Sequence, residues 1–371
     1  MWRGLRAERV TLQLTALSDT VNLFLVATPL QYLGAEVILK NYEAGKRNHL
    51  FYVRPDISSV INNALWTDVQ FLPWPKKFPK KGLFGKMRRI RENLLTVNKV
   101  CENASDIRLH VWMLRSEATN YHVNALRKAF PESHLSVRII PDGTLGLFRR
   151  ELQWYEKLGL RLRKLRRIIY PSLNYYLFSG DRIGTDAPIV DRVYCLSGIP
   201  HEFDGSKTCE LPSLVEADFK KDKHTKRALV LSQPFFQLGK CSKAELEKVT
   251  AGIRAYLVSQ HMDLIEYKQH PYDRIKEFYN PDYKELTISE PLEKYLGKHF
   301  YHLVIGVDSA ALFLAKAIYG NQSKIVSFGK NVMHSSHGLM SPRKAQKRSK
   351  AIQALREQME KSDIEQIDCN M

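Results

Sequence analysis

Cysteine is scarce in this chain, and its few copies are not arranged in pairs. The 371 residues contain five cysteines, at positions 101, 195, 209, 241 and 369, and no two of them form a Cys-x-x-Cys motif. An odd number of widely spaced thiols argues against a disulfide framework and against a structural zinc site. This usage favours a reducing compartment, so we expect a cytoplasmic protein.

Long apolar runs are also missing. The best candidate, residues 300–320, contains His302 and Asp308, so we interpret it as a strand followed by a helix rather than a membrane span. The N-terminus has three arginines in its first nine residues, but polar residues alternate with the leucines that follow, unlike in a signal peptide. We therefore expect residues 1–20 to be an extension before the first core strand.

Familiar nucleotide and metal signatures are absent. The chain has no Walker sequence, no Gly-x-Gly-x-x-Gly and no Asp-x-Asp pair that could hold a nucleotide-bound metal. His334 and His337 are spaced like metal ligands, but they lack carboxylate partners and lie in a predicted loop. We expect no metal or other cofactor.

Acidic residues are outnumbered, and the excess of basic residues is concentrated. Lys and Arg number 57 against 39 Asp and Glu, a net charge of +18. Residues 76–91 contain eight basic residues and no acid, residues 149–167 eight basic residues and two acids, and residues 343–350 five basic residues. Each cluster alone could be a solvated face. Together they favour an anionic partner such as a charged substrate, an anionic lipid or a nucleic acid.

One of these clusters includes an amphipathic segment. In residues 159–170, leucine and isoleucine are interleaved with arginine and lysine, and Tyr175, Tyr176 and Phe178 follow. This composition suits the interface of an anionic membrane. It suits equally well a helix packed on its domain with a basic outer face.

Strands alternate with helices along the chain, which predicts parallel sheets with helices on their faces, an α/β fold. We predict strands at 21–27, 48–53, 68–72, 109–113, 137–140, 227–232, 264–268, 301–306 and 324–327. We predict a turn at 28–31 and helices at 32–42, 57–65, from about 86 to 101, and at 159–170, 242–260, 310–319 and 342–361. The corresponding organisation is an extension (1–20), a first Rossmann-like domain (21–195), a connection (196–226), a second Rossmann-like domain (227–342) and a polar helix and tail (343–371).

Three polar sites follow predicted strands. Asp142 precedes Gly143, which permits a tight turn, so the carboxylate could project beyond the sheet and accept a proton. His270 is held in extended backbone by Pro271, and its imidazole could act as an acid or stabilise a leaving phosphate. Each fragment alone could equally be a turn or a strand end.

The third site is a strand-turn-helix junction. Ser309 and Ala310 begin a predicted helix, whose free N–H groups could bind phosphate. Ser309 could also be only an N-cap, and a carboxylate at Asp308 would repel phosphate. Lys268, on the strand before His270, could add positive charge, although a surface lysine is the simpler interpretation.

In their order along the chain, these fragments resemble the bacterial sialyltransferases of GT-B fold, a group that includes lipooligosaccharide sialyltransferases and capsular polysialyltransferases. The shared signatures are an acidic-Gly motif, matched by Asp142-Gly143, an HP motif, matched by His270-Pro271, and a Ser/Thr motif, matched by Ser309. The segments Thr28-Pro-Leu-Gln31 and Leu229-Val-Leu-Ser-Gln-Pro234 also resemble the start of each domain in this group. Pro141 and Asp308 depart from the family pattern.

The resemblance implies two Rossmann-like domains facing a central cleft and inverting, metal-independent transfer of sialic acid from CMP-sialic acid to a glycan hydroxyl. It implies Asp142 as general base and His270 as general acid. The substrate-binding residues that we expect are Gly143, Lys268, Pro271, Ser309, Ala310, Gln233, Thr28 and Gln31. The implied role is synthesis of a sialylated surface glycan, such as lipopolysaccharide O-antigen, lipooligosaccharide or capsule, by a cytoplasmic enzyme that could bind the membrane peripherally.

Three alternatives remain open from the sequence. A GT-B enzyme could use another nucleotide sugar, because a phosphate site names neither base nor sugar. A basic nucleic-acid-binding protein would need a binding module, and none is recognisable, so we expect no nucleic acid partner. A non-catalytic membrane scaffold would not depend on Asp142 or His270.

Overall fold

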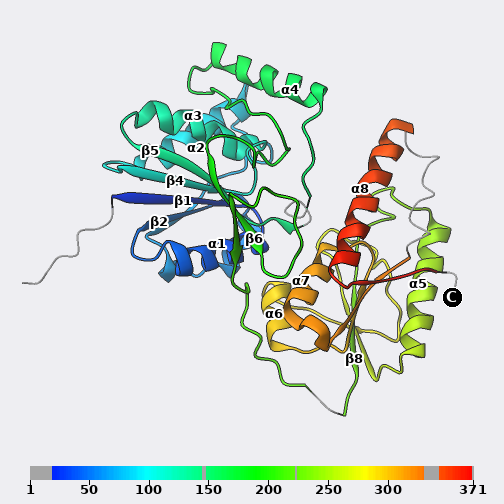
Figure 1. Ribbon diagram of the computed structural model, residues 1–371. Coiled ribbons are helices and arrows are strands. Elements are labelled where there is room, and N and C mark those ends of the chain that lie inside the picture. The colour runs from blue at the N-terminus through cyan, green and yellow to red at the C-terminus, as the bar shows by residue number, and fades with distance from the viewer. Residues whose placement is uncertain (1–18, 144–147, 222–223, 330–341, 370–371) are drawn as a thin grey trace, which may run out of the picture.

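The computed structural model describes residues 19–143, 148–221, 224–329 and 342–369, with the side chains of the last segment described from residue 349. Two parallel sheets, one in each half of the chain, carry helices on both faces (Figure 1). The predicted pair of Rossmann-like α/β domains is therefore confirmed. Most of the predicted extension lies outside the described residues, as do His334 and His337, the pair that the sequence analysis did not accept as metal ligands.

The first sheet has seven strands in the order β3-β2-β1-β4-β5-β6-β7. They are β1 (Thr20–Val26), β2 (Arg47–Tyr52), β3 (Asp68–Phe71), β4 (Asp106–Val111), β5 (His134–Ile139), β6 (Val190–Leu196) and β7 (Thr208–Leu211). All neighbours are parallel. The continuous apolar run of β1 is fully buried, as expected for a central strand covered on both faces. Because β7 pairs with β6, the first domain extends into the segment predicted as a connection (196–226).

The first sheet is covered by helices that the sequence predicts only in part. They are α1 (Pro29–Tyr42), the 3-10 turns η1 (Pro55–Val60) and η2 (Asn63–Leu65), α2 (Gly85–Lys99), α3 (Glu117–Ala129), α4 (Trp154–Lys164) and the 3-10 turn η4 (Leu165–Ile168). The helix predicted at 57–65 is wrong, since two short turns stand there. The turn predicted at 28–31 is also wrong, because Thr28 caps a helix that begins at Pro29.

The second sheet has six parallel strands in the order β10-β9-β8-β11-β12-β13. Its elements are β8 (Arg227–Leu231), α5 (Lys243–Ser259), β9 (Leu264–Lys268), β10 (Lys284–Glu285), α6 (Leu292–Lys298), β11 (Leu303–Gly306), α7 (Ala310–Tyr319), the 3-10 turn η5 (Gly320–Gln322), β12 (Lys324–Phe328), α8 (Pro342–Lys361) and β13 (Glu365–Ile367). Strand β13 pairs with β12, so the segment predicted as a polar tail completes this sheet.

The two domains share part of a core. Phe148 and Ile199, which come from the first half of the chain, belong to the same buried cluster as Leu231 and Leu312 of the second domain. Helix α8 lies between the domains in Figure 1, and its Gln358 donates a hydrogen bond to Glu202 at 3.3 Å. The domains are therefore held together by buried side chains as well as by the chain between them.

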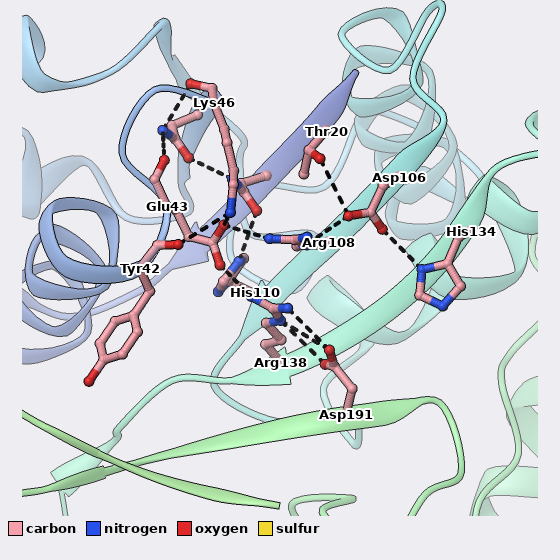
Figure 2. A network of polar contacts seen from close by, with 12 residues as sticks. Thr20, Tyr42, Glu43, Lys46, Asp106, Arg108, His110, His134, Arg138 and Asp191 are labelled. Carbon is pink, nitrogen blue, oxygen red and sulfur yellow. Dashed lines mark hydrogen bonds and ion pairs between the residues drawn. The ribbon is translucent and has the colours of Figure 1, made fainter. Parts of the chain in front are cut away.

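A network of buried charges ties α1 to the first sheet. Glu43, at the end of α1, is 1 % exposed and forms ion pairs with Lys46 at 2.7 Å, with Arg108 of β4 at 2.8 Å, and with Arg138 of β5 (Figure 2). Arg138 also binds Asp191 at 3.2 Å. Buried charges cost desolvation energy unless they are paired, and here they are paired on every side.

Candidate active site

The polar residues predicted as sites all lie beyond the carboxyl ends of parallel strands. Asp142 follows β5, Thr28 follows β1, His270 follows β9 and Ser309 follows β11. In open α/β sheets this edge is where ligands bind, at the point where the strand order reverses. That reversal falls between β1 and β4 in the first sheet and between β8 and β11 in the second.

Asp142 is held by the residues that begin α1. Its Oδ1 accepts a hydrogen bond from Nε2 of Gln31 at 2.8 Å. Gln31 is itself fixed, because its Oε1 accepts from the backbone N–H of Ala27 at 2.6 Å and its own N–H donates to Thr28 at 3.3 Å. Gly143 has φ +41, the left-handed conformation that the predicted turn requires. The predicted residues Thr28, Gln31, Asp142 and Gly143 therefore form one unit.

Burial raises the pKa of the Asp142 carboxyl, and the hydrogen bond from Gln31 opposes the shift only in part. The carboxylate is therefore a stronger base than a solvated aspartate once it is ionised. A carboxyl group with these properties suits proton transfer at a partly desolvated site.

Asp142 lines a cavity of about 610 Å³ in the first domain. The walls combine two tryptophans with a set of basic side chains, namely Arg54, Lys76, Lys86, Arg115 and Arg163. Glu117 is the other acid in the lining, and it is neutralised by ion pairs with Lys86, Arg163 and Arg166. The cavity suits an anionic ligand with an apolar or sugar face.

His270 stands two residues after β9, and its ring orientation is defined by the backbone. Its Nδ1 accepts a hydrogen bond from the N–H of Tyr272 at 3.1 Å. A neutral imidazole that accepts at Nδ1 carries its proton on Nε2, so Nε2–H is a donor. Burial lowers the pKa of His270, with Lys268 and Lys240 acting in the same direction and Asp273 against it.

A buried carboxylate that the sequence reasoning missed organises this loop. Asp273 is 4 % exposed and accepts hydrogen bonds from the hydroxyls of Ser232 and Tyr267, the latter at 3.1 Å, and from the N–H of Glu277 at 2.8 Å. Asp273 is the third residue after His270, in His-Pro-Tyr-Asp. An acid so close to the candidate histidine is the one signal in the sequence that indicates its role. Asp273 is a positioning residue for the loop that carries His270.

Ser309 caps α7 and holds Gln233. Its Oγ accepts from the N–H of Ala311 at 3.3 Å and from Nε2 of Gln233 at 2.9 Å, and the residue is 2 % exposed. Both of the predicted residues are therefore at the start of α7, but the Ser309 hydroxyl already has protein partners. Asp308 has φ +43, and its Oδ1 lies 3.7 Å from Nε of Arg356 in α8. This ion pair offsets the charge that we expected to repel phosphate.

The other two predicted residues flank His270. Lys268 is half-buried, its Nζ donates to the carbonyl of Gln269 at 2.9 Å, and burial lowers its pKa. Pro271 is exposed. Neither position excludes contact with a ligand beside the imidazole.

Two contacts join the first domain's site to the second domain's site. A Cβ atom at Gly143 would lie 3.9 Å from the Cβ of Ala310, so the turn after Asp142 lies against the start of α7. Tyr272 interacts with Arg54, a wall residue of the Asp142 cavity. Burial lowers the pKa of Arg54, but Asp56 and the Tyr272 hydroxyl together raise it by more. The three separate strand ends therefore converge between the domains. Arg54 and Tyr272 were not predicted, because a contact between domains leaves no local pattern in the sequence.

Comparison with known proteins identifies the family. The model of the alpha-2,8-polysialyltransferase (POLYST) family matches residues 22–327. The chain belongs to this family. It is therefore a glycosyltransferase of the sialyltransferase type, as the three motifs predicted. No curated protein matches the chain in sequence.

Several solved structures are similar in overall arrangement. A putative UDP-N-acetylglucosamine 2-epimerase from Listeria monocytogenes matches with a TM-score of 0.48 at 10% identity, covering 92% of this chain and 91% of that one. The glycosyltransferase SnogD from Streptomyces nogalater matches with a TM-score of 0.44 at 11% identity, covering 94% and 96%. Both likenesses are distant.

Proposed function

We propose that this protein transfers sialic acid from CMP-sialic acid to a hydroxyl of a glycan acceptor, with inversion at the anomeric carbon. The observation that carries the proposal is the convergence of a part-buried carboxyl, Asp142, and a half-buried imidazole, His270, from facing domains. The contacts Gly143–Ala310 and Arg54–Tyr272 bring their two loops together. A donor bound between the domains would have a base on one side and an imidazole N–H donor on the other.

The proposed reaction needs a base at the acceptor hydroxyl and a hydrogen-bond donor at the leaving phosphate. Asp142 takes the proton of the acceptor hydroxyl as its oxygen forms a bond to the anomeric carbon. The bond from that carbon to the phosphate oxygen breaks, and CMP leaves as an anion whose phosphate oxygen accepts a hydrogen bond from the Nε2–H of His270. A neutral imidazole keeps this proton, so His270 stabilises the leaving group as a hydrogen-bond donor. Burial raises the pKa of Asp142, which makes it a stronger base, and lowers that of His270, which keeps the imidazole neutral with Nε2–H as the donor.

The start of α7 is the proposed site for the CMP phosphate. The helix begins at Ala310, and its first N–H groups and partial positive charge suit an anion. Gln233 and Ser309 fix this helix start, and Lys268 adds a positive charge near His270. These groups can stabilise the leaving group without a metal, so we propose that the reaction needs none.

The basic cavity is the proposed acceptor site. Its basic side chains would favour an acceptor that carries carboxylates, and its tryptophans offer a surface for sugar rings. A sialic-acid-terminated acceptor fits this better than a neutral galactose terminus. In the cell, we propose that the product is a sialylated surface polysaccharide, such as O-antigen, lipooligosaccharide or capsule, made at the cytoplasmic side of the membrane.

A transfer assay tests the proposal. The purified protein is given CMP-sialic acid and a panel of sialic-acid-terminated and galactose-terminated oligosaccharides, and the products are read by mass spectrometry. We expect release of CMP, a mass increase of one or more sialic acids, and no change on adding EDTA. Parallel reactions with UDP-sugars identify a different donor. Folded protein that releases no CMP but transfers from a UDP-sugar would overturn the proposal.

A further inference from the structure

The outer side of α4 and η4 is apolar, which is unusual for a helix at the surface of a domain. Trp154, Leu158 and Leu162 are spaced four residues apart and therefore share one face of the helix. Their exposed fractions are 72%, 48% and 58%, and Ile168 in η4 is exposed by 76%. In Figure 1, α4 forms the upper rim of the first domain.

Part of the polar side of the same helix faces the domain. Arg163 binds Glu117 of α3 at 3.2 Å, and Glu156 binds Arg115 at 3.0 Å. Leu160 is buried in a small cluster with residues of α2 and α3. A surface helix normally buries its apolar stripe and exposes its charges. Here the ion pairs are inside and most of the apolar side chains are outside, so the domain's own core does not account for the exposed face.

A neighbouring loop extends this apolar face. Leu83 is 80% exposed and Phe84 is 42% exposed, and the ring of Phe84 lies 6.5 Å from that of Tyr170, just after η4. We call Trp154, Leu158, Leu162, Leu165, Ile168, Ile169, Leu83 and Phe84 the outer apolar face.

The exposed charges within the two segments that form the outer apolar face are basic. Lys81, Lys157, Arg161 and Arg167 are exposed. The one acid between residues 154 and 169 is Glu156, which is buried, and residues 76–91 contain none. Large apolar side chains among exposed basic ones match the boundary between acyl chains and anionic headgroups. A protein partner would need its own acidic rim and apolar centre.

We infer that the outer apolar face docks on an anionic lipid bilayer, with α4 lying in the plane of the headgroups. If the Asp142 cavity binds the acceptor, as the proposed function holds, docking also places the acceptor site. Arg163 of α4 and Lys76 of the neighbouring loop both line that cavity. Docking would therefore hold the cavity beside the membrane surface, where a lipid-linked glycan presents its growing end.

Vesicle binding tests the inference, with the variant L162Q/I168Q against the control L238Q/V258Q. The control residues are exposed by 56% and 64% but belong to the second domain. We expect the unchanged protein and the control to float with phosphatidylcholine vesicles containing phosphatidylglycerol, and much less with phosphatidylcholine alone. L162Q/I168Q should bind the anionic vesicles at least about tenfold more weakly. Equal binding by the two variants would overturn the inference.

Two further measurements separate the other outcomes. Transfer to a soluble oligosaccharide reports the proposed function alone, and L162Q/I168Q should retain it. If the unchanged protein does not transfer sialic acid to the soluble oligosaccharide, the proposed function is contradicted and the docking inference is not. Sedimentation velocity shows whether the face joins two copies of the chain. A dimer that becomes a monomer only in L162Q/I168Q, without vesicle binding by either, would also overturn the inference.

Discussion

At the scale of single residues, burial displaces the pKa values of Asp142 and His270 in opposite directions. Burial favours the neutral form of any ionisable group, so it raises the pKa of a carboxyl and lowers that of an imidazole. The resting site therefore holds less charge than two solvated side chains would. Gln31 occupies Oδ1 of Asp142, which leaves Oδ2 to take a proton. The Tyr272 N–H occupies Nδ1 of His270, which leaves Nε2–H as the donor.

The substitution Asp142→Asn separates catalysis from stability. A raised pKa in the folded state means that ionised Asp142 opposes folding at neutral pH, a cost that is relieved as pH falls through the folded-state pKa. The amide keeps an oxygen that can accept from Gln31 and removes the charge. We expect transfer to fall by at least about 100-fold while the melting temperature stays the same or rises. A marked loss of stability, measured by thermal unfolding, would contradict the assignment.

The acid limb of the pH–rate profile should follow the same carboxyl. Transfer needs ionised Asp142, so activity falls as pH drops through its pKa, and that midpoint should lie above the usual carboxyl range because the pKa is raised. We expect the acid limb of kcat/KM to disappear from the residual activity of D142N. A midpoint at or below the pKa of a solvated aspartate would show that burial does not raise the pKa of the catalytic base.

At the scale of elements, the Glu43 network shows how α1 is positioned on the sheet. Glu43 terminates the helix whose other end carries Thr28 and Gln31. Its partners Arg108 and Arg138 come from β4 and β5, and Asp142 follows β5. The network therefore fixes the helix and the strand that bring Gln31 and Asp142 together, although it lies at the opposite end of α1.

Removing the charge of Glu43 should destabilise the protein strongly. Glu43→Gln leaves the buried Arg138 and the part-buried Arg108 short of a compensating charge, and breaking such a pair costs about 3–5 kcal/mol. Urea unfolding followed by circular dichroism measures the change. The control is Glu247→Gln in α5, which like its partner Lys243 is exposed, and we expect less than about 1 kcal/mol there. Similar losses in the two variants would show that the network is not special.

The sequence predicted strands better than helices, and particular elements show why. Strands β9 and β11 are short segments rich in apolar residues, and polar residues follow each of them, so each can be recognised from its own stretch of sequence. Helix α3 was not predicted, because it buries polar residues such as Asn120 and His122 and so lacks a clean apolar stripe. The amphipathic character of α4 was visible, but which side faces the domain depends on Glu117, which comes from a distant element.

At the scale of the whole molecule, the site exists only where two domains meet. Glu36 of α1 and Lys294 of α6 approach to 3.8 Å across the domains, in addition to the contacts of Gly143 and Arg54. The order of the three motifs predicted the two domains that carry them. The order of the motifs could not predict how far apart the two domains lie, because that distance depends on side chains such as Phe148 that pack into the other domain.

The contact between Tyr272 and Arg54 should matter for catalysis rather than for folding. Tyr272→Phe removes the hydroxyl that interacts with Arg54, and so weakens the link between the loop of His270 and the first domain. We expect kcat/KM for transfer to fall by about tenfold with little change in melting temperature. Tyr279→Phe, whose ring packs on Tyr267 within the second domain, is the control. Unchanged kinetics in Y272F would remove this contact from the mechanism.

The order of the strands along the chain has a consequence for biosynthesis. The first sheet is complete at Leu211, before any strand of the second sheet begins, so this half can fold while the ribosome is still adding the rest. Phe148 and Ile199 have no cover at that stage, because their cluster is made by residues from Leu229 onward. A nascent chain of this length would therefore expose an apolar patch at Phe148 and Ile199 that chaperones can bind. The patch is buried once the second half has been synthesised and has folded.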